Sequence, residues 1–509
     1  MKKPAFRRII SFALALIMLV GMLAVPTSAS ETEDYGRYIF DRDELENLIY
    51  KLRVEKELNI VYLGGSVTDG YGSSAGGSWR ELVGRWFEDT FAEAEINNYN
   101  ASIGGSGSMS GAFRLETDVL SHTPDLVFVE AAVNDGYCGH FADGTVQTYY
   151  ETILRKIREQ SPDTEIISVF VNDKKTLVDH VNYDLSEIAA LQNEVADYYD
   201  VTGINVGRAV QNRIVETYGA SRLDEGWAAY IKDYVHPLNA GYRVYADVII
   251  AYLSSKLSDS AATPEAVVPH TCPQGFFDKG ASRLETEYVK VSPEIFTSMT
   301  GWTYSEDAIY PKIDTAGCIY PSADENSFTY RFNGTGLAIL MEFSGGQFYF
   351  DISIDGKEPE RVDMYDTSHP FHKAIENLEP GDHTVTISYV GMNIDEDNNK
   401  TAVPGHDPRV KLSRFFISKE RKIDLIGDIN GDNIIDTADY LYFARALAGV
   451  AGYKDLKAAA YADLNGDKFV TPADLAVLAR HLAAWKGYAS LPIANSDRGA
   501  DESMYSPKN

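Results

Sequence analysis

The sequence predicts three folded parts: an α/β domain with a parallel sheet covered on both faces, an all-β sandwich, and a small α-helical unit with paired acidic loops. Over residues 58–257, apolar runs alternate with amphipathic stretches, as strands and helices do in a parallel sheet. Over residues 284–419, short alternating runs are separated by turn residues, which is typical of a sandwich. An acidic motif then occurs twice, at 427–432 and 462–467, which indicates two copies of one small unit.

The composition agrees with this division. The chain has 509 residues, and because domains of roughly 100–200 residues are the norm, about three are expected. A hydrophobic content of 44% indicates globular domains rather than disorder. The formal net charge of -29 argues against nucleic acid and against anionic membrane surfaces as partners.

The N-terminus has the features of a secretory signal peptide. A basic start over Lys2–Arg8 precedes an apolar run over Ile9–Val25, and small residues follow up to Ala29. A retained membrane anchor is the alternative, but the run is shorter than the roughly 20 residues of a membrane span. We therefore expect cleavage near Ala29 and a secreted protein without a membrane partner.

The α/β region can be divided into individual elements. Buried strands are expected at the apolar runs, and helices at the amphipathic stretches between them. The predicted strands include Asn59–Leu63, Asp125–Val133 and Glu165–Val171, and the predicted helices include Trp79–Phe91, Gln147–Glu159 and Asp184–Tyr199.

Three consecutive strands are followed by residues suited to acyl transfer. Ser66 follows the first strand, Gly105 the second and Asn134 the third. Because the carboxyl ends of parallel strands meet at one edge of a sheet, these residues are expected to lie together. The backbone N–H groups of Ser66 and Gly105 and the side-chain amide of Asn134 are donors of the kind that stabilises an oxyanion.

A later segment supplies a base. His236 is followed by Pro237, and because proline suits the first turn of a helix, the imidazole is expected in the loop just before the last helix of the domain. Asp233, three residues earlier, can reach Nδ1 of the imidazole and fix its tautomer. His236 would then take the proton of the Ser66 hydroxyl, which is a poor nucleophile without a neighbouring base.

These blocks resemble the SGNH/GDSL hydrolases in order and in role. In that family, the positions matching Ser66, His236 and Asp233 form the catalytic triad. The positions matching Gly105 and Asn134 join the nucleophile's own N–H in the oxyanion hole. The resemblance therefore implies a serine esterase that needs no cofactor for catalysis.

The resemblance covers roughly residues 55–257 and implies a flavodoxin-like three-layer α/β/α fold. Gly65 departs from the family's Gly-Asp-Ser pattern, and we do not interpret this change as inactivation. Thr68 stands where a Gly-x-Ser-x-Gly elbow has its second glycine, which argues against the α/β-hydrolase fold.

Each motif alone also has an ordinary structural explanation. Glycines after strands often form simple turns, and Asn134 with Asp135 could cap a helix. It is their joint occurrence that favours a hydrolase site. Arg114 and Glu130 are weaker candidates, and a structural ion pair is the simpler role for Arg114.

Residues 284–420 resemble the jelly-roll-like sandwiches found beside carbohydrate esterases. Trp302, Tyr304 and Tyr349 could stack on sugars, although buried aromatic residues are the commoner case in small sandwiches. Sugar binding by this part is a hypothesis at the level of fold analogy.

Each copy of the acidic motif fits a twelve-residue calcium loop that leads into an apolar helix, Tyr440–Leu447 or Leu475–Ala483. The alternative is a pair of acidic turns that only cap these helices. Asn433 and Lys468 stand at position six, where glycine is usual, and because lysine tolerates a left-handed backbone less well, we expect weaker binding at the second loop. The expected ligands are Asp428, Asn430, Asp432, Ile434, Asp436 and Asp439 in the first loop, and Asp463, Asn465, Asp467, Phe469, Thr471 and Asp474 in the second.

The duplicated loop–helix units resemble type I-like dockerins, which have aspartate at position twelve and no preceding EF-type helix. The resemblance covers about residues 424–488. It implies two structural Ca²⁺ sites and a cohesin module of a scaffolding protein as the partner. Recognition is expected at loop positions ten and eleven, and because the two pairs differ, a symmetrical dual binding mode is not expected. These residues are Thr437, Ala438, Pro472 and Ala473.

These observations predict a secreted, cellulosome-associated esterase that removes O-acetyl groups from plant cell-wall polysaccharide, with acetylated xylan first. The substrate follows from the dockerin resemblance, because dockerin-bearing enzymes mostly act on plant walls. The alternatives are a GDSL lipase, an aryl or pectin esterase, and a non-catalytic carbohydrate- and cohesin-binding protein. The expected parts are a signal peptide (1–29), a hydrolase domain (30–257), a linker (258–283), a β-sandwich (284–420), a dockerin (424–488) and a disordered tail (489–509).

Overall fold

A computed structural model describes most of the chain. Contacts divide the chain into a unit over Met1–Arg37 and a unit over Tyr38–Asn509. The predicted signal peptide and the tail beyond residue 491 lie outside the described residues. The described residues are 35–138, 145–174, 185–272, 284–308, 316–342, 347–365, 371–375, 378–393, 410–420, 426–430, 435–450, 456, 460–466, 469–485, 488 and 491.

The α/β part is built on a sheet with the strand order β1-β6-β5-β4-β2-β3. Neighbouring strands are parallel except β1, which pairs antiparallel with β6. β4 and β5 are buried along their whole length, as expected for central strands with both faces covered. The strands are β1 (Ile39–Phe40), β2 (Glu57–Gly64), β3 (Glu95–Ser102), β4 (Leu126–Val129), β5 (Glu165–Phe170) and β6 (Thr202–Asn205).

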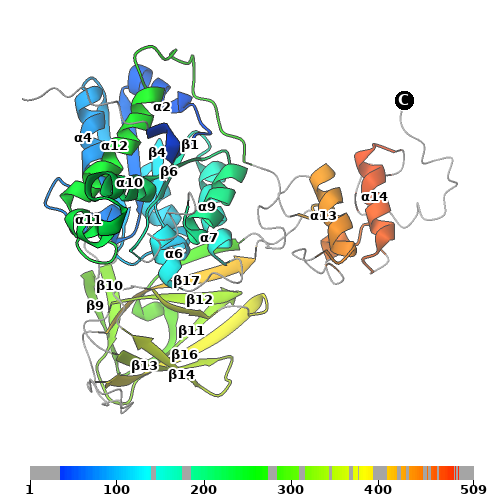
Figure 1. The fold of residues 1–509 in the computed structure, drawn as a ribbon. Helices are drawn as coiled ribbons and strands as arrows, with labels where there is room; N and C mark the ends of the chain where they lie inside the picture. The colour runs from blue at the N-terminus through cyan, green and yellow to red at the C-terminus, as the bar shows by residue number, and fades with distance from the viewer. Residues whose placement is uncertain are drawn as a thin grey trace, which may run out of the picture. The chain divides into compact units, whose positions relative to one another are not determined.

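Helices cover both faces of this sheet (Figure 1). On one face α12 contacts α4 and α10, and on the other α7 contacts α5 and α9. The helical elements are η1 (Tyr35–Tyr38), α2 (Glu46–Tyr50), η2 (Lys51–Glu55), α3 (Ser66–Asp69), α4 (Trp79–Thr90), α5 (Ser108–Arg114), η3 (Leu115–Val119), η4 (Leu120–His122), α6 (Ala132–Cys138), α7 (Thr145–Gln160), α9 (Glu187–Tyr198), α10 (Val206–Tyr218), η5 (Ala220–Arg222), α11 (Leu223–Tyr230) and α12 (Asn239–Lys256).

The predicted alternation of strands and helices is confirmed, with differences at the ends of individual elements. The strand predicted over Asp125–Val133 ends at Val129, because α6 already begins at Ala132. Pro237, which was expected in the first turn of the last helix, precedes that helix, since α12 begins at Asn239. His236 still lies in the loop before the helix, as predicted.

The core of the α/β part packs side chains of the sheet against those of the covering helices. Val61 and Val127 on the strands and Ile153 and Ile157 on α7 are fully or almost fully buried. Burial of each such side chain contributes roughly 1.5–3 kcal/mol. Gly111 on α5 allows close packing, because a Cβ there would lie 2.9 Å from Ile153 Cδ1.

Two antiparallel sheets follow. One has the order β15-β12-β17-β10-β9, with β7 also paired to β17, and the other has the order β14-β13-β16-β11-β8. Aromatic side chains fill the space between them, and the rings of Tyr330 and Phe415 stack with centroids 4.4 Å apart. The strands are β7 (Leu284–Lys290), β8 (Phe296–Thr300), β9 (Trp302–Ala308), β10 (Ala316–Pro321), β11 (Ser327–Gly334), β12 (Gly336–Glu342), β13 (Gln347–Ile354), β14 (Glu360–Tyr365), β15 (Phe371–Ile375), β16 (Gly381–Asn393) and β17 (Lys411–Glu420), with a short helical turn η6 (Pro293–Ile295).

β7 contacts α7 of the α/β part. Arg155 Nη2 donates to the Leu284 carbonyl at 2.7 Å, and Lys156 Nζ donates to Thr286 Oγ1 at 2.9 Å. Both cationic side chains are 2% exposed, so their polar atoms depend on these partners rather than on water. These contacts fix the first strand of the β part against the helix that covers the parallel sheet.

The C-terminal part contains α13 (Thr437–Leu447) and α14 (Pro472–Leu482), with a short turn η7 (Ala460–Ala462). The helices contact each other around a small core that includes Phe443 and Leu478. Each begins three residues before its predicted start, because Asp436 and Thr471 form N-caps. In the described stretches of the chain, no helix is both long enough and apolar enough to cross a membrane.

Candidate active site

Ser66 lies just beyond the carboxyl end of β2, at the first residue of α3. The two glycines before it permit this tight passage. A Cβ on Gly64 would lie 2.4 Å from Thr68 Oγ1, and a Cβ on Gly65 would lie 2.0 Å from Asn134 Nδ2. A side chain at Gly65 would therefore displace the Asn134 amide, which gives a steric reason for glycine at this position.

The imidazole of His236 joins Ser66 to Asp233. Ser66 Oγ lies 2.7 Å from His236 Nε2, and His236 Nδ1 lies 2.9 Å from Asp233 Oδ2. Asp233 Oδ1 also accepts the backbone N–H groups of Val235 and His236. Partial burial would raise the pKa of Asp233, but these N–H groups and the imidazole outweigh burial and lower it below its usual value. An ionised Asp233 keeps the proton on Nδ1, so Nε2 can accept the Ser66 hydroxyl proton.

The predicted oxyanion donors reach the same edge of the sheet. Gly105 has a φ of 77°, in the left-handed region that favours glycine. A Cβ on the neighbouring Gly104 would lie 3.8 Å from Ser66 Cβ, which places this loop beside the serine. Asn134, 6% exposed in the first turn of α6, donates from Nδ2 to the Ser106 carbonyl at 3.0 Å. The amide nitrogen carries a second N–H that can serve a ligand.

Two buried carboxylates support these loops. Glu130 Oε2 accepts the Gly65 N–H at 3.3 Å and the Thr68 hydroxyl at 2.9 Å, and burial raises the pKa of Glu130. Asp135 Oδ1 accepts the Ser108 N–H at 2.8 Å, and burial raises the pKa of Asp135 to about 7. The sequence marked Glu130 only as a weak candidate, although its position at the end of a strand was a usable signal.

Arg114 has the structural role that the sequence favoured. Its guanidinium is buried, forms an ion pair with Asp118, and donates to the Ala101 carbonyl and to Ser106 Oγ. Because Ala101 and Ser106 flank the loop that carries Gly105, Arg114 holds this loop in place.

Two exposed tyrosines lie near the triad residues, and one of them contacts the imidazole. Tyr71 is 53% exposed, and its ring meets that of His236 edge-on with centroids 4.5 Å apart. Lys232 Nζ lies 4.4 Å from the centroid of the Tyr71 ring. Tyr234, in the loop between Asp233 and His236, is 58% exposed. Neither tyrosine was predictable from the sequence, because no motif distinguishes an exposed tyrosine from a buried one.

In the described part of the first acidic loop, three of the predicted ligands are buried. Asp428, Asn430 and Asp439 are at most 2% exposed. Asp439 Oδ1 accepts the N–H groups of Ile429 and Asn430, and its Oδ2 accepts that of Asp436. Three predicted ligands lie outside the described residues: Asp432, Ile434 and Asp467.

The second loop repeats this arrangement. Asp474 Oδ1 accepts the N–H groups of Leu464 and Asn465, and its Oδ2 accepts that of Thr471. The Phe469 side chain is 69% exposed, which is compatible with a role for its carbonyl alone. An all-oxygen donor set with a buried carboxylate fits Ca²⁺ in both loops. The helix-capping interpretation also applies, since each loop provides a capping box.

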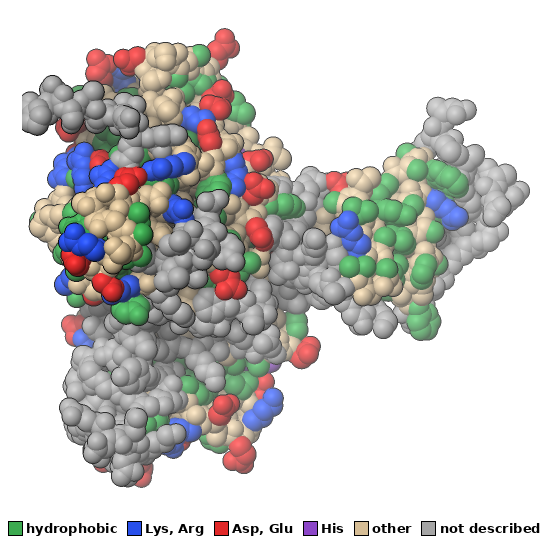
Figure 2. Space-filling model, viewed as in Figure 1, with side chains coloured by type: hydrophobic (Ala, Val, Ile, Leu, Met, Phe, Trp, Pro, Cys, Tyr) green, Lys and Arg blue, Asp and Glu red, His purple; other side chains and the backbone are tan. Residues whose placement is uncertain are grey.

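The residues predicted to contact cohesin lie in the first turns of the two C-terminal helices. Tyr440 and Leu441, further along α13, are 37% and 50% exposed, and hydrophobic side chains are visible on the surface of this part (Figure 2). The predicted contacts are Thr437 and Ala438 on α13 and Pro472 and Ala473 on α14.

Two of the aromatic residues considered for sugar stacking are buried. Trp302 is 6% exposed and packs edge-on against Phe328, and Tyr349 is 5% exposed. Tyr304, also considered, packs against the same core and is only partly buried. The buried rings of Trp302 and Tyr349 therefore stabilise the β part and present no face to a ligand.

Family models match three segments of the chain. Residues 62–244 match the GDSL-like Lipase/Acylhydrolase family, residues 318–407 match Carbohydrate esterase 2 N-terminal, and residues 426–483 match the Dockerin type I domain. The carbohydrate esterase match lies after the acylhydrolase match, although its description refers to an N-terminal domain. No curated protein is similar enough to the chain to count as a relative.

Solved structures resemble much of the chain. A two-domain esterase active on acetylated mannans has 21% identity and a TM-score of 0.60, with 76% of this chain and 99% of that chain covered. Its complex with mannopentaose gives a TM-score of 0.58 at the same identity and coverage. An acetyl xylan esterase variant from Geobacillus stearothermophilus has 19% identity and a TM-score of 0.32, with 40% of this chain and 96% of that chain covered.

Proposed function

We propose that the chain removes O-acetyl groups from plant cell-wall polysaccharide. Its matches to the GDSL-like acylhydrolase and carbohydrate esterase 2 models make it a carboxylic ester hydrolase, and a type I dockerin follows them. The observation that supports this proposal best is the unbroken chain of contacts from Ser66 Oγ through the His236 imidazole to Asp233. A serine hydroxyl within 2.7 Å of an oriented imidazole is the arrangement that nucleophilic acyl transfer requires.

In the first half-reaction, Ser66 Oγ attacks the carbonyl carbon of the ester while its proton passes to His236 Nε2. The carbonyl oxygen becomes an oxyanion, and the N–H groups of Ser66 and Gly105 with the Asn134 amide are the proposed donors to it. The bond to the sugar oxygen then breaks, and His236 Nε2 returns the proton to that oxygen. The products are a free sugar hydroxyl and acetyl-Ser66.

In the second half-reaction, His236 Nε2 takes a proton from water, and the water oxygen attacks the acetyl carbon. The tetrahedral species collapses to acetate, and the proton returns to Ser66 Oγ. Throughout the cycle, Asp233 stays ionised and stabilises the imidazolium that forms in each half-reaction. The lowered pKa of Asp233 supports this role.

Acetylated xylan is the proposed first substrate, with acetylated mannan as the second candidate. The match to a carbohydrate esterase model supports a sugar ester in general. Acetylated mannan is favoured by one observation, the likeness over 76% of this chain to a two-domain esterase active on acetylated mannans. A small acyl group on a polymer is common to both substrates, so the assay must separate them.

The dockerin match indicates calcium binding, cohesin binding and an extracellular, cellulosome-associated protein. We propose that both acidic loops bind Ca²⁺, and that cohesin contacts the first turns of α13 and α14 together with Tyr440 and Leu441. We also propose that residues 1–29 are a cleaved signal peptide.

The domain boundaries predicted from the sequence remain proposals, as do the flavodoxin-like arrangement of the hydrolase domain and the jelly-roll-like character of the sandwich. The proposed boundaries are 30–257, 258–283, 284–420 and 424–488.

The proposal is tested by acetate release from acetylated xylan, acetylated mannan, acetylated pectin and p-nitrophenyl esters, with the full chain and its Ser66→Ala variant. Matching circular dichroism and melting temperature would show that the variant is folded. Release from xylan or mannan by the wild type alone would support a polysaccharide deacetylase and identify its substrate. Turnover of p-nitrophenyl acetate alone would leave an esterase without the polysaccharide substrate. No turnover by a folded wild type would favour the non-catalytic binding protein.

A further inference from the structure

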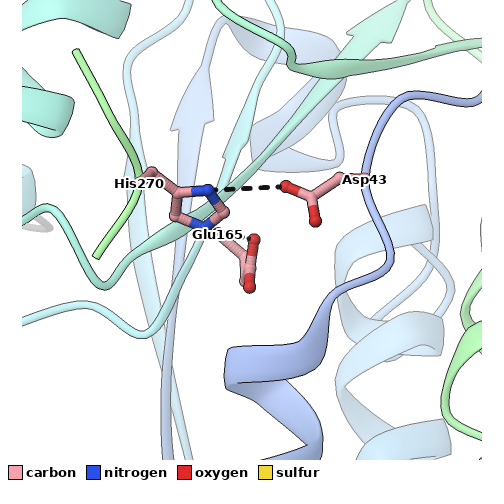
Figure 3. A group of neighbouring side chains, drawn as sticks. All are labelled: Asp43, Glu165 and His270. Atoms are coloured by element: carbon pink, nitrogen blue, oxygen red, sulfur yellow. Dashed lines mark ion pairs between the residues drawn. The ribbon is translucent and has the colours of Figure 1, made fainter. Parts of the chain in front are cut away.

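A second histidine–carboxylate cluster lies at the opposite end of the parallel sheet. Glu165 is the first residue of β5, whereas Ser66 and Asn134 follow the carboxyl ends of their strands. Asp43, which precedes α2, and His270, which follows α12, meet Glu165 there (Figure 3). One ligand atom of each residue lies within 4.8 Å of the others. The proposed esterase reaction uses none of these residues.

Each carboxylate in the cluster uses one oxygen on the protein backbone and points the other toward His270. Asp43 Oδ1 accepts the Leu45 N–H at 2.9 Å, and its Oδ2 lies 4.0 Å from His270 Nδ1. Glu165 Oε1 accepts the Asn47 N–H at 3.2 Å, and its Oε2 lies 2.9 Å from His270 Nε2. The backbone thus orients both carboxylates, as the outer shell of a metal site does.

The inward-pointing oxygen of Glu165 has an ion-pair contact with His270 but, among the described residues, no hydrogen bond of normal geometry. Glu165 is 1% exposed, and among the described residues no donor with hydrogen-bond geometry serves its Oε2, despite the 2.9 Å approach of His270 Nε2. Asn47 Nδ2 is 3.4 Å from the same imidazole nitrogen, but it already donates to the carbonyls of Asp163 and Val268. A buried carboxylate oxygen and an imidazole nitrogen this close together can both be satisfied by one cation that they ligate from the same side.

The charge balance leaves room for a cation. Arg158 is buried nearby, and Glu165 and Asp43 are the two charged groups that act on it most strongly. Burial raises the pKa of Glu165 to about 7, and a cation bound to its carboxylate would favour the ionised form. With both carboxylates ionised and His270 neutral, these groups and the Arg158 guanidinium carry one net negative charge. Arg158 weakens cation binding relative to an all-acidic cluster, but the net charge of the cluster stays negative.

We propose that Asp43, Glu165 and His270 bind a divalent transition-metal ion of the zinc class. One imidazole nitrogen with two carboxylate oxygens is a donor set that suits Zn²⁺, with water at the remaining position. Ca²⁺ prefers oxygen ligands alone, so the cluster differs in kind from the two dockerin loops. The ion would tie the segment after α12, through His270, to the start of β5 and to Asp43.

The expected role of this ion is structural. Residues 258–272 already contact the α/β part, since Arg53 donates to the carbonyls of Ser258 and Ala261 and Asn47 accepts the Val268 N–H. Binding to the folded state alone raises the melting temperature by mass action. We therefore expect zinc to raise the melting temperature of the full chain by a few degrees.

The test is metal stoichiometry in the full chain after loading with Zn²⁺ in excess Ca²⁺ and desalting, with bound metals measured by mass spectrometry. His270→Gln and Glu165→Gln, which keep side-chain size, are expected to lose one equivalent of zinc and the zinc-dependent rise in melting temperature. Both variants should keep the bound calcium of the wild type. His236→Ala is the matched control, because a loss there would place the zinc at the esterase site instead.

Cobalt loading gives a second readout, since ligand-field absorption reports nitrogen and oxygen ligation of Co²⁺. We expect this absorption in the wild type and its loss in His270→Gln. Equal zinc in the wild type and in His270→Gln, or displacement of the zinc by Ca²⁺, would overturn the assignment. Turnover of p-nitrophenyl acetate by metal-free protein keeps this outcome separate from the proposed function.

Discussion

The two ends of the parallel sheet hold the same pair of groups in different surroundings. His236 Nδ1 lies 2.9 Å from a carboxylate oxygen of Asp233, and His270 Nε2 lies 2.9 Å from one of Glu165. Asp233 is 42% exposed by its side chain, whereas Glu165 is 1% exposed. The first imidazole also has the Ser66 hydroxyl at 2.7 Å. A histidine–carboxylate contact therefore does not specify catalysis, and the proposed nucleophile and oxyanion donors are what distinguish the two ends.

Replacing each histidine in turn tests most strongly whether the two ends of the sheet differ in function. His236→Gln is expected to lower kcat/KM on the order of 10⁴-fold or more, because Ser66 loses its base. Its melting temperature should change little, since the side chain is partly exposed. His270→Gln should leave kcat/KM unchanged and should lower the zinc-bound melting temperature. Equal loss of activity in the two variants would mean that the ends of the sheet are not functionally distinct.

Replacing the carboxylates should also lower activity only at the Ser66 end, and by less than replacing the histidine. Asp233→Asn is expected to lower kcat by about 10²–10⁴-fold, because an amide stabilises the imidazolium poorly and can favour the wrong tautomer. Glu165→Gln serves as the control with unchanged kcat. Steady-state kinetics on p-nitrophenyl acetate measures both variants. An Asp233→Asn enzyme with wild-type kcat would remove Asp233 from the triad.

The proposed oxyanion donors, which the Ser66 end has and the opposite end lacks, can be tested through Asn134. Asn134→Ala removes the side-chain amide and is expected to lower kcat by about 10²–10³-fold with a smaller change in KM. The amide also donates to the Ser106 carbonyl, so the melting temperature must be measured alongside. A change confined to KM would indicate that Asn134 binds substrate rather than the oxyanion.

The smallest expected effect concerns stability near the catalytic end. The pKa of buried Asp135 is raised to about 7, so the folded state holds a proton that the unfolded state releases near pH 4. This group therefore costs no stability below about pH 4, and the cost grows as the pH rises to about 7.

Asp135→Asn is expected to remove that pH dependence. Gln192 Nε2 now donates to Asp135 Oδ2, and Gln192 Oε1 has no partner among the described residues, so a rotated Gln192 amide could accept from the new asparagine. Urea unfolding at several pH values should show the variant gaining stability relative to the wild type between pH 4 and 7, by about 1 kcal/mol or more. A constant difference across that range would contradict the raised pKa.

The grouping of residues at the Ser66 end of the sheet was predictable from the sequence because they follow strands in a fixed order. Ser66, Gly105 and Asn134 each come just after a strand, and Asp233 and His236 are close in sequence. The alternation of apolar runs and amphipathic stretches also predicted the sheet, since the strands of a parallel sheet are buried on both faces and therefore apolar along their length.

The opposite end was not predictable, because Asp43, Glu165 and His270 are far apart in the chain and follow no spacing rule. Three-dimensional contacts alone bring them together. The position of Glu130 at the end of a strand was a usable signal, but its contacts with the Gly65 N–H and the Thr68 hydroxyl appear only in the fold.

The central claim, that Ser66 forms the acyl intermediate, is tested most directly by trapping that intermediate. The full chain would be mixed with excess p-nitrophenyl acetate, quenched in acid at short times, digested and analysed by peptide mass spectrometry. We predict that an acetyl group appears on the peptide containing Ser66, and that it is absent in Ser66→Ala. Acetylation of another residue in an active enzyme, or turnover by Ser66→Ala at the wild-type rate, would contradict the assignment of Ser66 as the nucleophile.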